Sequence, residues 1–321
     1  MLHLSTSKND LATAARILKQ GGIVGLPTET VYGLAGLASQ EVALQKIFKV
    51  KARPSNHPLI VHISNRIEVS QWSAALPVAV DSLVQRLIDA FWPGPLSLIL
   101  PAAPHVSPWV TGGQPKVALR MPAHPVALDL LGMLGGGVCA PSANRFGGIS
   151  PTSAQHVIDD LGTQIDAIID AGPCICGMES TILDLTVHPV VILRPGMISS
   201  EQLSEVLGFA PLTLRQARDT QSPGLLDKHY APAKPLQLLT SEQMTGVNFT
   251  PAQPSVVLSA QPPRWPCHWL EMPTTAERYA QALYDCLRIA DQWPEPLIYV
   301  ETPPQHGLWL TIYDRLLRAS H

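Results

Sequence analysis

The chain of 321 residues has few charged side chains, few aromatics and no long apolar run, and each shortage excludes a class of protein. Lysine and arginine number 22 against 25 acidic residues, with a formal net charge of −3. No polybasic run occurs, which argues against a protein that mainly binds nucleic-acid backbone. The longest apolar runs, such as 96–100 and 189–193, are far shorter than the roughly 20 residues that span a bilayer, so we expect no membrane association.

Cysteine is also scarce, and several motifs are missing. Five cysteines, an odd number in a long chain, favour free thiols in a reducing compartment, so we expect a cytoplasmic protein. Cys174 and Cys176 lack the partner pairs of a zinc site. The motifs G-x-G-x-x-G, G-x-x-x-x-G-K-[ST], H-E-x-x-H and G-x-S-x-G are absent, so dinucleotide-binding, P-loop, zincin and hydrolase classes receive no support.

Apolar residues are plentiful, at 46%, and their spacing alternates between strand and helix. A length above about 250–300 residues favours two domains, and alternating elements favour an α/β fold with a mixed or parallel sheet. The spacing predicts helices over 8–20, 41–50, 78–91, 126–134, 153–161 and 200–207. It predicts strands over 23–26, 59–63, 96–100, 117–120, 138–140, 167–169, 181–185 and 190–193.

Between 209 and 235 the periodicity gives way to Pro, Arg, Gln, Ser and Gly. We therefore expect a large domain over 1–208, a linker over 209–235 and a smaller α/β domain over 236–321, with strands near 236–239, 255–258 and 297–300 and a helix over 276–289. The linker contains Ser222-Pro223-Gly224 and His229-Tyr230-Ala231-Pro232. Imidazole and phenol groups are unusual in a flexible spacer, so this segment either packs between the domains or contacts a ligand.

The first candidate site lies around two cations near the N-terminus. Lys51 and Arg53 follow a predicted helix and precede the apolar run 58–62, while the segment 27–34 brings small hydroxyls to the end of another apolar run. Hydroxyls and backbone N–H groups position phosphate, and Lys and Arg neutralise it. Taken alone, such a pair is more often two exposed cations after a helix.

Further polar residues follow other predicted strands. Ser142 and Asn144 come after the strand ending at Ala140, and they could bind phosphate or metal-bound water or form a local turn. Arg120 and Arg194 each end an apolar stretch, a position that suits bidentate binding of carboxylate or phosphate.

In order along the chain, these segments resemble the YrdC-like family of L-threonylcarbamoyladenylate synthases. The resemblance covers about residues 7–208, and the linker motifs extend it to about 235 in the long, two-domain form. Eight motifs carry it: 27–34, Lys51-x-Arg53-Pro54, 58–62, 92–95, 120–122, 141–144, 179–181 and 194–196.

The resemblance implies a YrdC-like twisted mixed sheet with helices around a concave cavity, and a smaller Rossmann-like C-terminal domain. It implies a nucleotidyltransferase that joins L-threonine, bicarbonate and ATP into threonylcarbamoyl-AMP and pyrophosphate for tRNA threonylcarbamoyladenosine biosynthesis. Mg²⁺ is expected with ATP, without protein side chains assigned as its ligands, and a downstream threonylcarbamoyl transferase is the expected partner.

The resemblance also implies residue roles. The catalytic, anion-binding centre would be Lys51, Arg53, Ser142 and Asn144. ATP would contact Arg53, His57, Lys116, Ser142, Arg194 and Tyr230, the last as part of a lid that excludes water. Threonine would contact Thr30, His62, Arg120, Ala140 and Ser180, with Arg120 on its carboxylate. At His57 and Lys116 relatives can carry Asn and Thr, so these two depart from the pattern.

Two other functions remain to be weighed. An RNA-binding module with this fold is disfavoured by the acidic balance and by the lack of interleaved aromatic and basic residues. A carbamoyl-transfer domain of the hydrogenase-maturation type would carry zinc-finger cysteine pairs and an acylphosphatase-like segment, and the sequence has neither.

Overall fold

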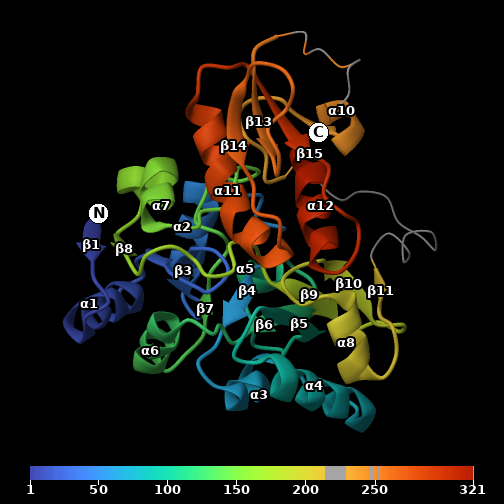
Figure 1. The fold of residues 1–321 in the computed structure, drawn as a ribbon. Coiled ribbons are helices and arrows are strands. Elements are labelled where there is room, and N and C mark those ends of the chain that lie inside the picture. The colour runs from blue at the N-terminus through green and yellow to red at the C-terminus, as the bar shows by residue number, and fades with distance from the viewer. Residues whose placement is uncertain (214–228, 246–248, 250, 252, 321) are drawn as a thin grey trace.

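The computed structural model describes residues 1–213, 229–245, 249, 251 and 253–320. Figure 1 shows two units, a large one built on a long sheet and a small one stacked on it, with two helices of the small unit directed at the large one. Across the described ranges no helix is both long and apolar enough to cross a membrane. The linker motif at 222–224 lies outside the described residues.

The large unit is a mixed sheet, as expected. Parallel and antiparallel pairs of strands both occur along it. Its strand order among the described residues is β1 (Leu2–Leu4), β8 (Ala167–Ile169), β2 (Val24–Leu26), β3 (Gly33–Leu37), β7 (Val138–Cys139), β4 (Ile60–His62), β6 (Lys116–Arg120), β5 (Leu96–Pro101), β9 (Thr181–Asp184), β10 (Val191–Arg194) and β11 (Leu212–Thr213). Because β11 pairs with β10, this sheet continues to Thr213.

Helices surround the large sheet, and the longer ones lie where the apolar spacing predicts them, whereas the short helices over 69–72 and 108–111 are absent from the prediction. The helices are α1 (Lys8–Lys19), α2 (Glu41–Lys51), α3 (Val69–Trp72), α4 (Val78–Phe91), α5 (Pro108–Thr111), α6 (Pro125–Leu134), α7 (Ala154–Leu161) and α8 (Ser200–Leu207), with 3₁₀ turns at 66–68 and 162–164. In α1, Leu11, Ala14, Ala15 and Leu18 form one buried face, and Ser7 caps the first turn, as amphipathic helices require.

Strand β3 is absent from the sequence prediction because glycine disfavours strands. Its sequence Gly33-Leu-Ala-Gly36-Leu lies in the middle of the sheet, where neighbours approach closely. A Cβ on Gly33 would come 3.0 Å from the Cβ of Ala140, and one on Gly36 would come 2.9 Å from Ile47 Cδ1. The missing side chains are therefore what allows the strand to fit.

The small unit is a parallel sheet in the order β12 (Leu236–Leu239), β15 (Leu297–Glu301), β13 (Ser255–Ser259), β14 (His268–Glu271). Its helices are α10 (Ser241–Thr245), α11 (Ala276–Gln292) and α12 (Leu308–Ala319). Three strands and α11 are confirmed. Strand β14 and helix α12 are absent from the prediction, although Leu308, Ile312, Leu316 and Ala319 have the spacing of a helix face.

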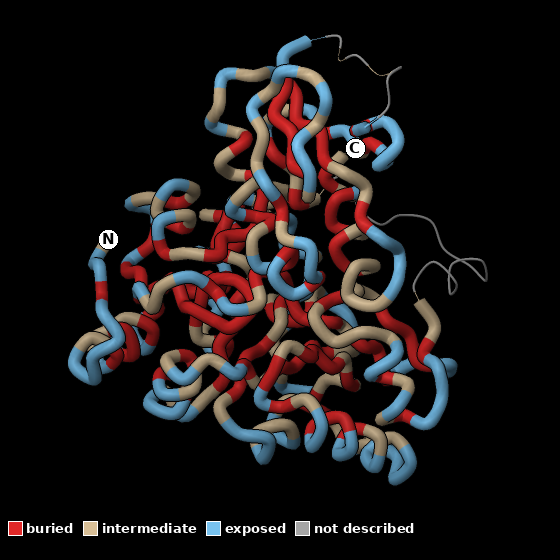
Figure 2. Tube along the Cα trace, in the orientation of Figure 1, coloured by how far each residue is buried: buried red, intermediate tan, exposed pale blue. Residues whose placement is uncertain are grey.

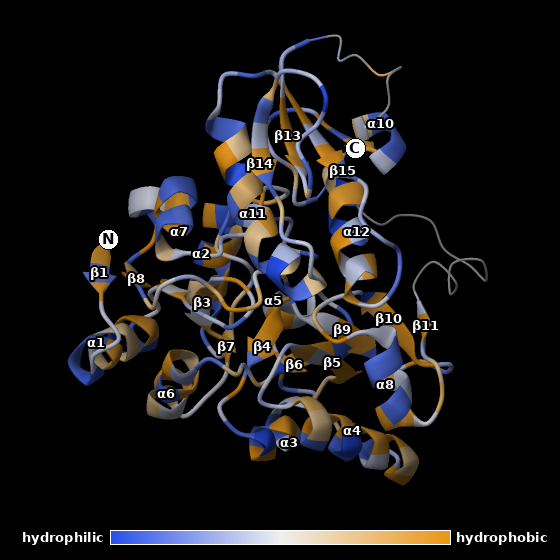
Figure 3. Cartoon of the chain, viewed as in Figure 1, coloured by the Kyte–Doolittle hydropathy of each residue, from blue (hydrophilic) through white to orange (hydrophobic). Residues whose placement is uncertain are grey.

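The two units share an apolar core. Val31, Ile149 and Met178 of the large unit pack in one cluster with Tyr284 and Leu316 of the small one. Figure 2 shows buried chain continuing from the large sheet into α11 and α12, and Figure 3 shows apolar stripes on the same elements. A shared apolar core of this kind disfavours free motion of the units relative to each other.

Candidate active site

One cavity brings together most of the residues that the sequence singles out. It has a volume of about 250 Å³ and lies where the large sheet, the loop 140–147 and the linker meet. Of the predicted site residues, it is lined by Thr30, Lys51, Arg53, His62, Arg120, Ala140, Ser142, Asn144, Ser180, Arg194 and Tyr230.

The floor of the cavity is formed by alternate residues of neighbouring strands, as the pleat of a sheet requires. Ile60 lies opposite Ala118, and Ile99 lies on the other side of Ala118. Two residues further along, His62 lies opposite Arg120. The floor is therefore apolar in its centre and polar at one end.

Lys51 is the last residue of α2, and its side chain is 1% exposed. Ala52 follows in a left-handed conformation with φ of 51°, which ends the helix. The ammonium group donates to the backbone oxygens of Ser142 and Asn144, at 2.5 and 2.6 Å. Burial, together with the nearby Arg53 charge, lowers the pKa of Lys51 to about 7. An anion in the cavity would favour the charged form.

Arg53 and Asn144 present unused polar atoms beside this lysine. The Arg53 guanidinium donates to the oxygen of Pro58 at 3.1 Å and lies over the Phe146 ring, while its Nε is buried without a partner. Asn144 donates through Nδ2 to the oxygens of Arg145 and Gly148, and its buried Oδ1 has no partner. Buried polar atoms are normally paired, so these two atoms point to a ligand.

The polar end of the floor is suited to a carboxylate. Buried Arg120 forms an ion pair with Glu29 at 2.6 Å and donates to Thr30 Oγ1 at 2.9 Å. Thr28 Oγ1 in turn contacts Thr30 Oγ1. Burial and the Arg120 charge lower the pKa of His62 to about 3, so this imidazole is neutral at physiological pH.

Arg194 also lines the cavity. It donates through Nε and Nη2 to the backbone oxygen of Ser180, and through Nη2 to Ser180 Oγ at 3.0 Å. Ser180 Oγ also contacts Ser97 Oγ at 2.8 Å. The hydroxyl is thereby held between a cation and a second hydroxyl, at the end of β9 that faces Arg120.

Two predicted ATP contacts lie elsewhere. Among the described residues, neither His57 nor Lys116 lines the cavity. The His57 ring packs edge-on against Phe146 at the rim, with centroids 5.3 Å apart. Lys116 shares the strand face of Ala118, but its ammonium is paired with Asp184 at 2.9 Å. A buried carboxylate therefore already neutralises it.

Comparison with known proteins shows the family to which the chain belongs. Residues 16–196 match the family model described as "Telomere recombination", and residues 198–321 match "Threonylcarbamoyl-AMP synthase, C-terminal domain". The threonylcarbamoyl-AMP synthase of Bacillus subtilis is 38% identical, over 99% of this chain and 94% of its own length. That of Pyrococcus abyssi is 36% identical, over 96% and 93%. This chain belongs to the threonylcarbamoyl-AMP synthase family.

The long, two-domain form of the synthase family is confirmed by matches that run through both units. The crystal structure of P. abyssi Sua5 complexed with L-threonine aligns with a TM-score of 0.88 at 33% identity, covering 99% of this chain and 97% of that one. A second structure, of a doubly substituted variant of P. abyssi Sua5, aligns with a TM-score of 0.89 at 31% identity, over 100% and 96%. The predicted fold class is confirmed as well.

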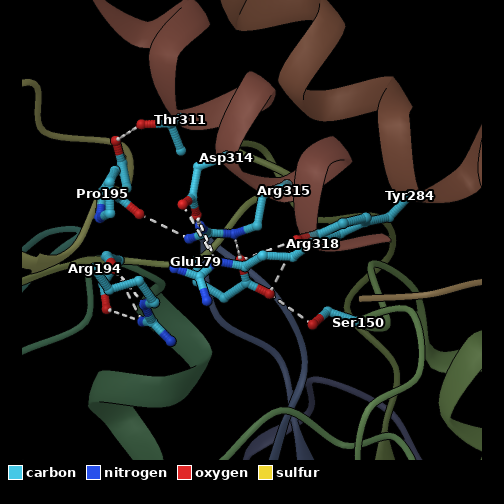
Figure 4. A network of polar contacts seen from close by, with 11 residues as sticks. Ser150, Glu179, Arg194, Pro195, Tyr284, Thr311, Asp314, Arg315 and Arg318 are labelled. Atoms are coloured by element: carbon cyan, nitrogen blue, oxygen red, sulfur yellow. Dashed lines mark hydrogen bonds and ion pairs between the residues drawn. The ribbon is translucent and has the colours of Figure 1, made fainter. Parts of the chain in front are cut away.

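Two further residues line the cavity without a role predicted from the sequence, Glu179 and His229. His229 packs against Phe146 and Tyr230, and burial lowers its pKa to about 4. Glu179 accepts from Ser150 Oγ at 2.6 Å, Tyr284 OH at 3.0 Å and Arg315 Nε at 2.9 Å (Figure 4). The sequence does contain an indication of Arg315, the partner of Glu179. Arg315 is a cation on the apolar stripe of α12, and a cation at a buried position needs an anionic or polar partner.

Proposed function

We propose that this synthase-family chain makes threonylcarbamoyl-AMP and pyrophosphate from L-threonine, bicarbonate and ATP, as a cytoplasmic nucleotidyltransferase that serves tRNA threonylcarbamoyladenosine biosynthesis. One observation carries the proposal. A single small cavity is lined both by Arg120, a group suited to a carboxylate, and by three further cationic residues, Lys51, Arg53 and Arg194. An amino acid and a polyphosphate could be bound together there.

Threonine would occupy the polar end. Its carboxylate would pair with Arg120, which Glu29 and Thr30 already orient. Its hydroxyl and amine would face His62 and Ser180, and its methyl group would face Ala140. Because the His62 imidazole is neutral, it can accept a hydrogen bond without repelling the amine.

The reaction would proceed in two steps. The threonine amine attacks bicarbonate, and loss of water leaves a carbamate. A carbamate oxygen then attacks the α-phosphorus of ATP, the bond to the bridging oxygen breaks, and pyrophosphate leaves. Lys51, Arg53 and Arg194 would neutralise the charge that develops on the phosphates, with Ser142 and Asn144 positioning the oxygens. Tyr230 would keep water out.

The residues present are compatible with Mg²⁺ that arrives with the nucleotide. Over the described ranges no group of three His, Cys, Asp or Glu residues could hold a metal ion. The unpartnered Oδ1 of Asn144 and the Ser142 hydroxyl are oxygen donors of the kind that Mg²⁺ or its waters prefer. The ion would neutralise charge on the phosphates. Because the walls of the cavity are cationic, we expect the phosphates, rather than protein side chains, to hold the ion.

Purified protein incubated with Mg-ATP should release pyrophosphate only when L-threonine and bicarbonate are both present. Release without threonine would refute the proposal. Tight, salt-sensitive RNA binding without any nucleotide turnover would instead favour an RNA-binding module. We expect the product to be consumed by a separate threonylcarbamoyl transferase, which can be tested by adding one with its tRNA.

A further inference from the structure

Arg315 on α12 joins both units of the molecule at the cavity. It is 1% exposed, and each of its nitrogens has a partner. Nε donates to Glu179 at 2.9 Å, Nη1 to Asp314 at 2.6 Å and Nη2 to the oxygen of Pro195 at 2.7 Å (Figure 4). Glu179 lines the cavity, and Pro195 directly follows Arg194, which also lines it. A side chain of the small unit therefore holds the cavity wall of the large unit.

The same guanidinium lies against the linker. Its central carbon is 4.7 Å from the centroid of the Tyr230 ring, within the range of a cation–π contact. On α11, Tyr284 stacks on Tyr230 with centroids 6.0 Å apart and planes 18° apart. Tyr230 lines the cavity and is 5% exposed. Its ring is therefore held by two side chains of the small unit.

The backbone of Tyr230 shows that these contacts are needed. Its φ is 61°, a left-handed conformation that a bulky residue adopts only when its surroundings impose it. Hydrogen bonds fix both neighbours, from His229 N to the oxygen of Arg318 and from Ala231 N to the oxygen of Gly147. One anchor lies on α12 and the other on the cavity loop, so the linker spans the two units at this residue.

We propose that Arg315 is a positioning residue of the active site, through which the C-terminal domain holds the Tyr230 ring against the cavity. The inference rests on the proposed function, because Tyr230 is there the group that keeps water from the carbamate. It gives the small unit a part in catalysis, beyond adding buried surface. Arg315 also keeps Glu179 ionised. Burial alone would raise the pKa of Glu179, but the charges of Arg315 and Arg194 hold that pKa at about 2.

The alternative is that Arg315 only docks the two units, and the chain provides a matched control. Arg288 on α11 is also largely buried and also crosses between the units, with Asp160 of α7 at 2.7 Å and the oxygen of Ile149. Among the described residues, Arg288 does not line the cavity, and its hydrogen bonds go to Asp160 and to the oxygen of Ile149. Arg288→Met therefore removes a docking ion pair and leaves the contacts of Arg315 and Tyr230 in place.

The test is a double-mutant cycle on kcat/KM for product formation, with Arg315→Met and Tyr230→Ala alone and combined. If Arg315 acts through Tyr230, Arg315→Met should lower kcat/KM about tenfold or more alone but less than about threefold in the Tyr230→Ala background. Arg288→Met should change kcat/KM by less than about threefold. Melting temperatures of all variants identify those that are merely unfolded.

Equal losses in both backgrounds, or an equal loss in Arg288→Met, would overturn the inference and leave Arg315 as a docking residue. If Arg315→Met does not fold, Arg315→Lys decides in the same cycle, because lysine keeps the charge beside Glu179 but cannot bond three partners and lie flat on the ring. A wild-type protein that forms no product refutes the proposed function itself, and that result is distinct from a failed cycle.

Discussion

Lys51 offers a quantitative prediction, because the structure buries its ammonium and leaves a cationic cavity beside it. With a pKa of about 7, the free enzyme at pH 8 carries only about 0.1 proton on this group. A phosphate charge about 4 Å from Nζ contributes about 4 kcal/mol at an effective dielectric constant of about 20, which corresponds to about 3 pKa units. Binding of Mg-ATP should therefore restore the ammonium.

The expected signal is an uptake of about 0.9 proton per Mg-ATP bound at pH 8. It is measured by titration calorimetry in buffers of different ionisation enthalpy, where the slope of observed enthalpy gives the proton count. At this pH the histidines His62 and His229 should stay neutral, since burial lowers the pKa of the first to about 3 and of the second to about 4. Arg53 stays charged, with a pKa of about 10.

Lys51→Met should reduce the uptake to near zero, whereas Lys116→Met should leave it unchanged because that ammonium is already paired with Asp184. A slope near zero in the wild-type protein, or the same slope in Lys51→Met, would refute the reasoning. If Lys51→Met binds nucleotide too weakly to titrate, NMR titration of labelled lysine decides instead. A midpoint near 7 is expected, and one near the ordinary value of 10.5 would contradict the prediction.

Three further changes test the site. Glu29→Gln leaves buried Arg120 without its ionic partner and should lower the free energy of unfolding by about 3 kcal/mol in chemical denaturation; a loss below about 1 kcal/mol would mean that the pair is solvated. Lys116→Met should change KM for ATP by less than about twofold, and a tenfold rise would return Lys116 to the nucleotide site. Tyr230→Ala should lower kcat about tenfold or more in protein that melting curves show to be folded at the assay temperature, although loss of this buried ring should also lower the melting temperature; unchanged turnover would reduce the linker to a spacer.

Elements with strong periodicity were predictable to the residue or nearly so. Helix α4 has the expected bounds of 78–91, because its apolar stripe is regular and a Pro-containing turn ends it. Strand β3 was not predictable from its sequence. Its glycines are needed because neighbouring residues approach closely, and glycine does not favour strands. Helix α12 follows a Pro-rich loop and was also missed, although its apolar residues recur at helix spacing and Arg315 lies among them.

The site shows the same division. Short motifs indicated Lys51, Arg120 and Arg194, because cations that end helices and strands in an α/β fold tend to meet at one edge of the sheet. Lys116 has equally suitable chemistry, but Asp184, distant in sequence, pairs with it. Charge alone cannot predict which cation stays free, since that depends on which carboxylate folds beside it.

What the sequence by itself determined is the family, the mixed α/β architecture and the set of polar side chains that the cavity could use, because these follow from local spacing and ordered motifs. The tertiary structure decided which of those side chains are buried and which partners they have. It turned Lys51 into a buried group that loses its proton near neutral pH, and it brought Arg315 from near the C-terminus onto Glu179 and Tyr230. Both outcomes depend on burial and on pairing between distant segments, and neither leaves a trace in local sequence.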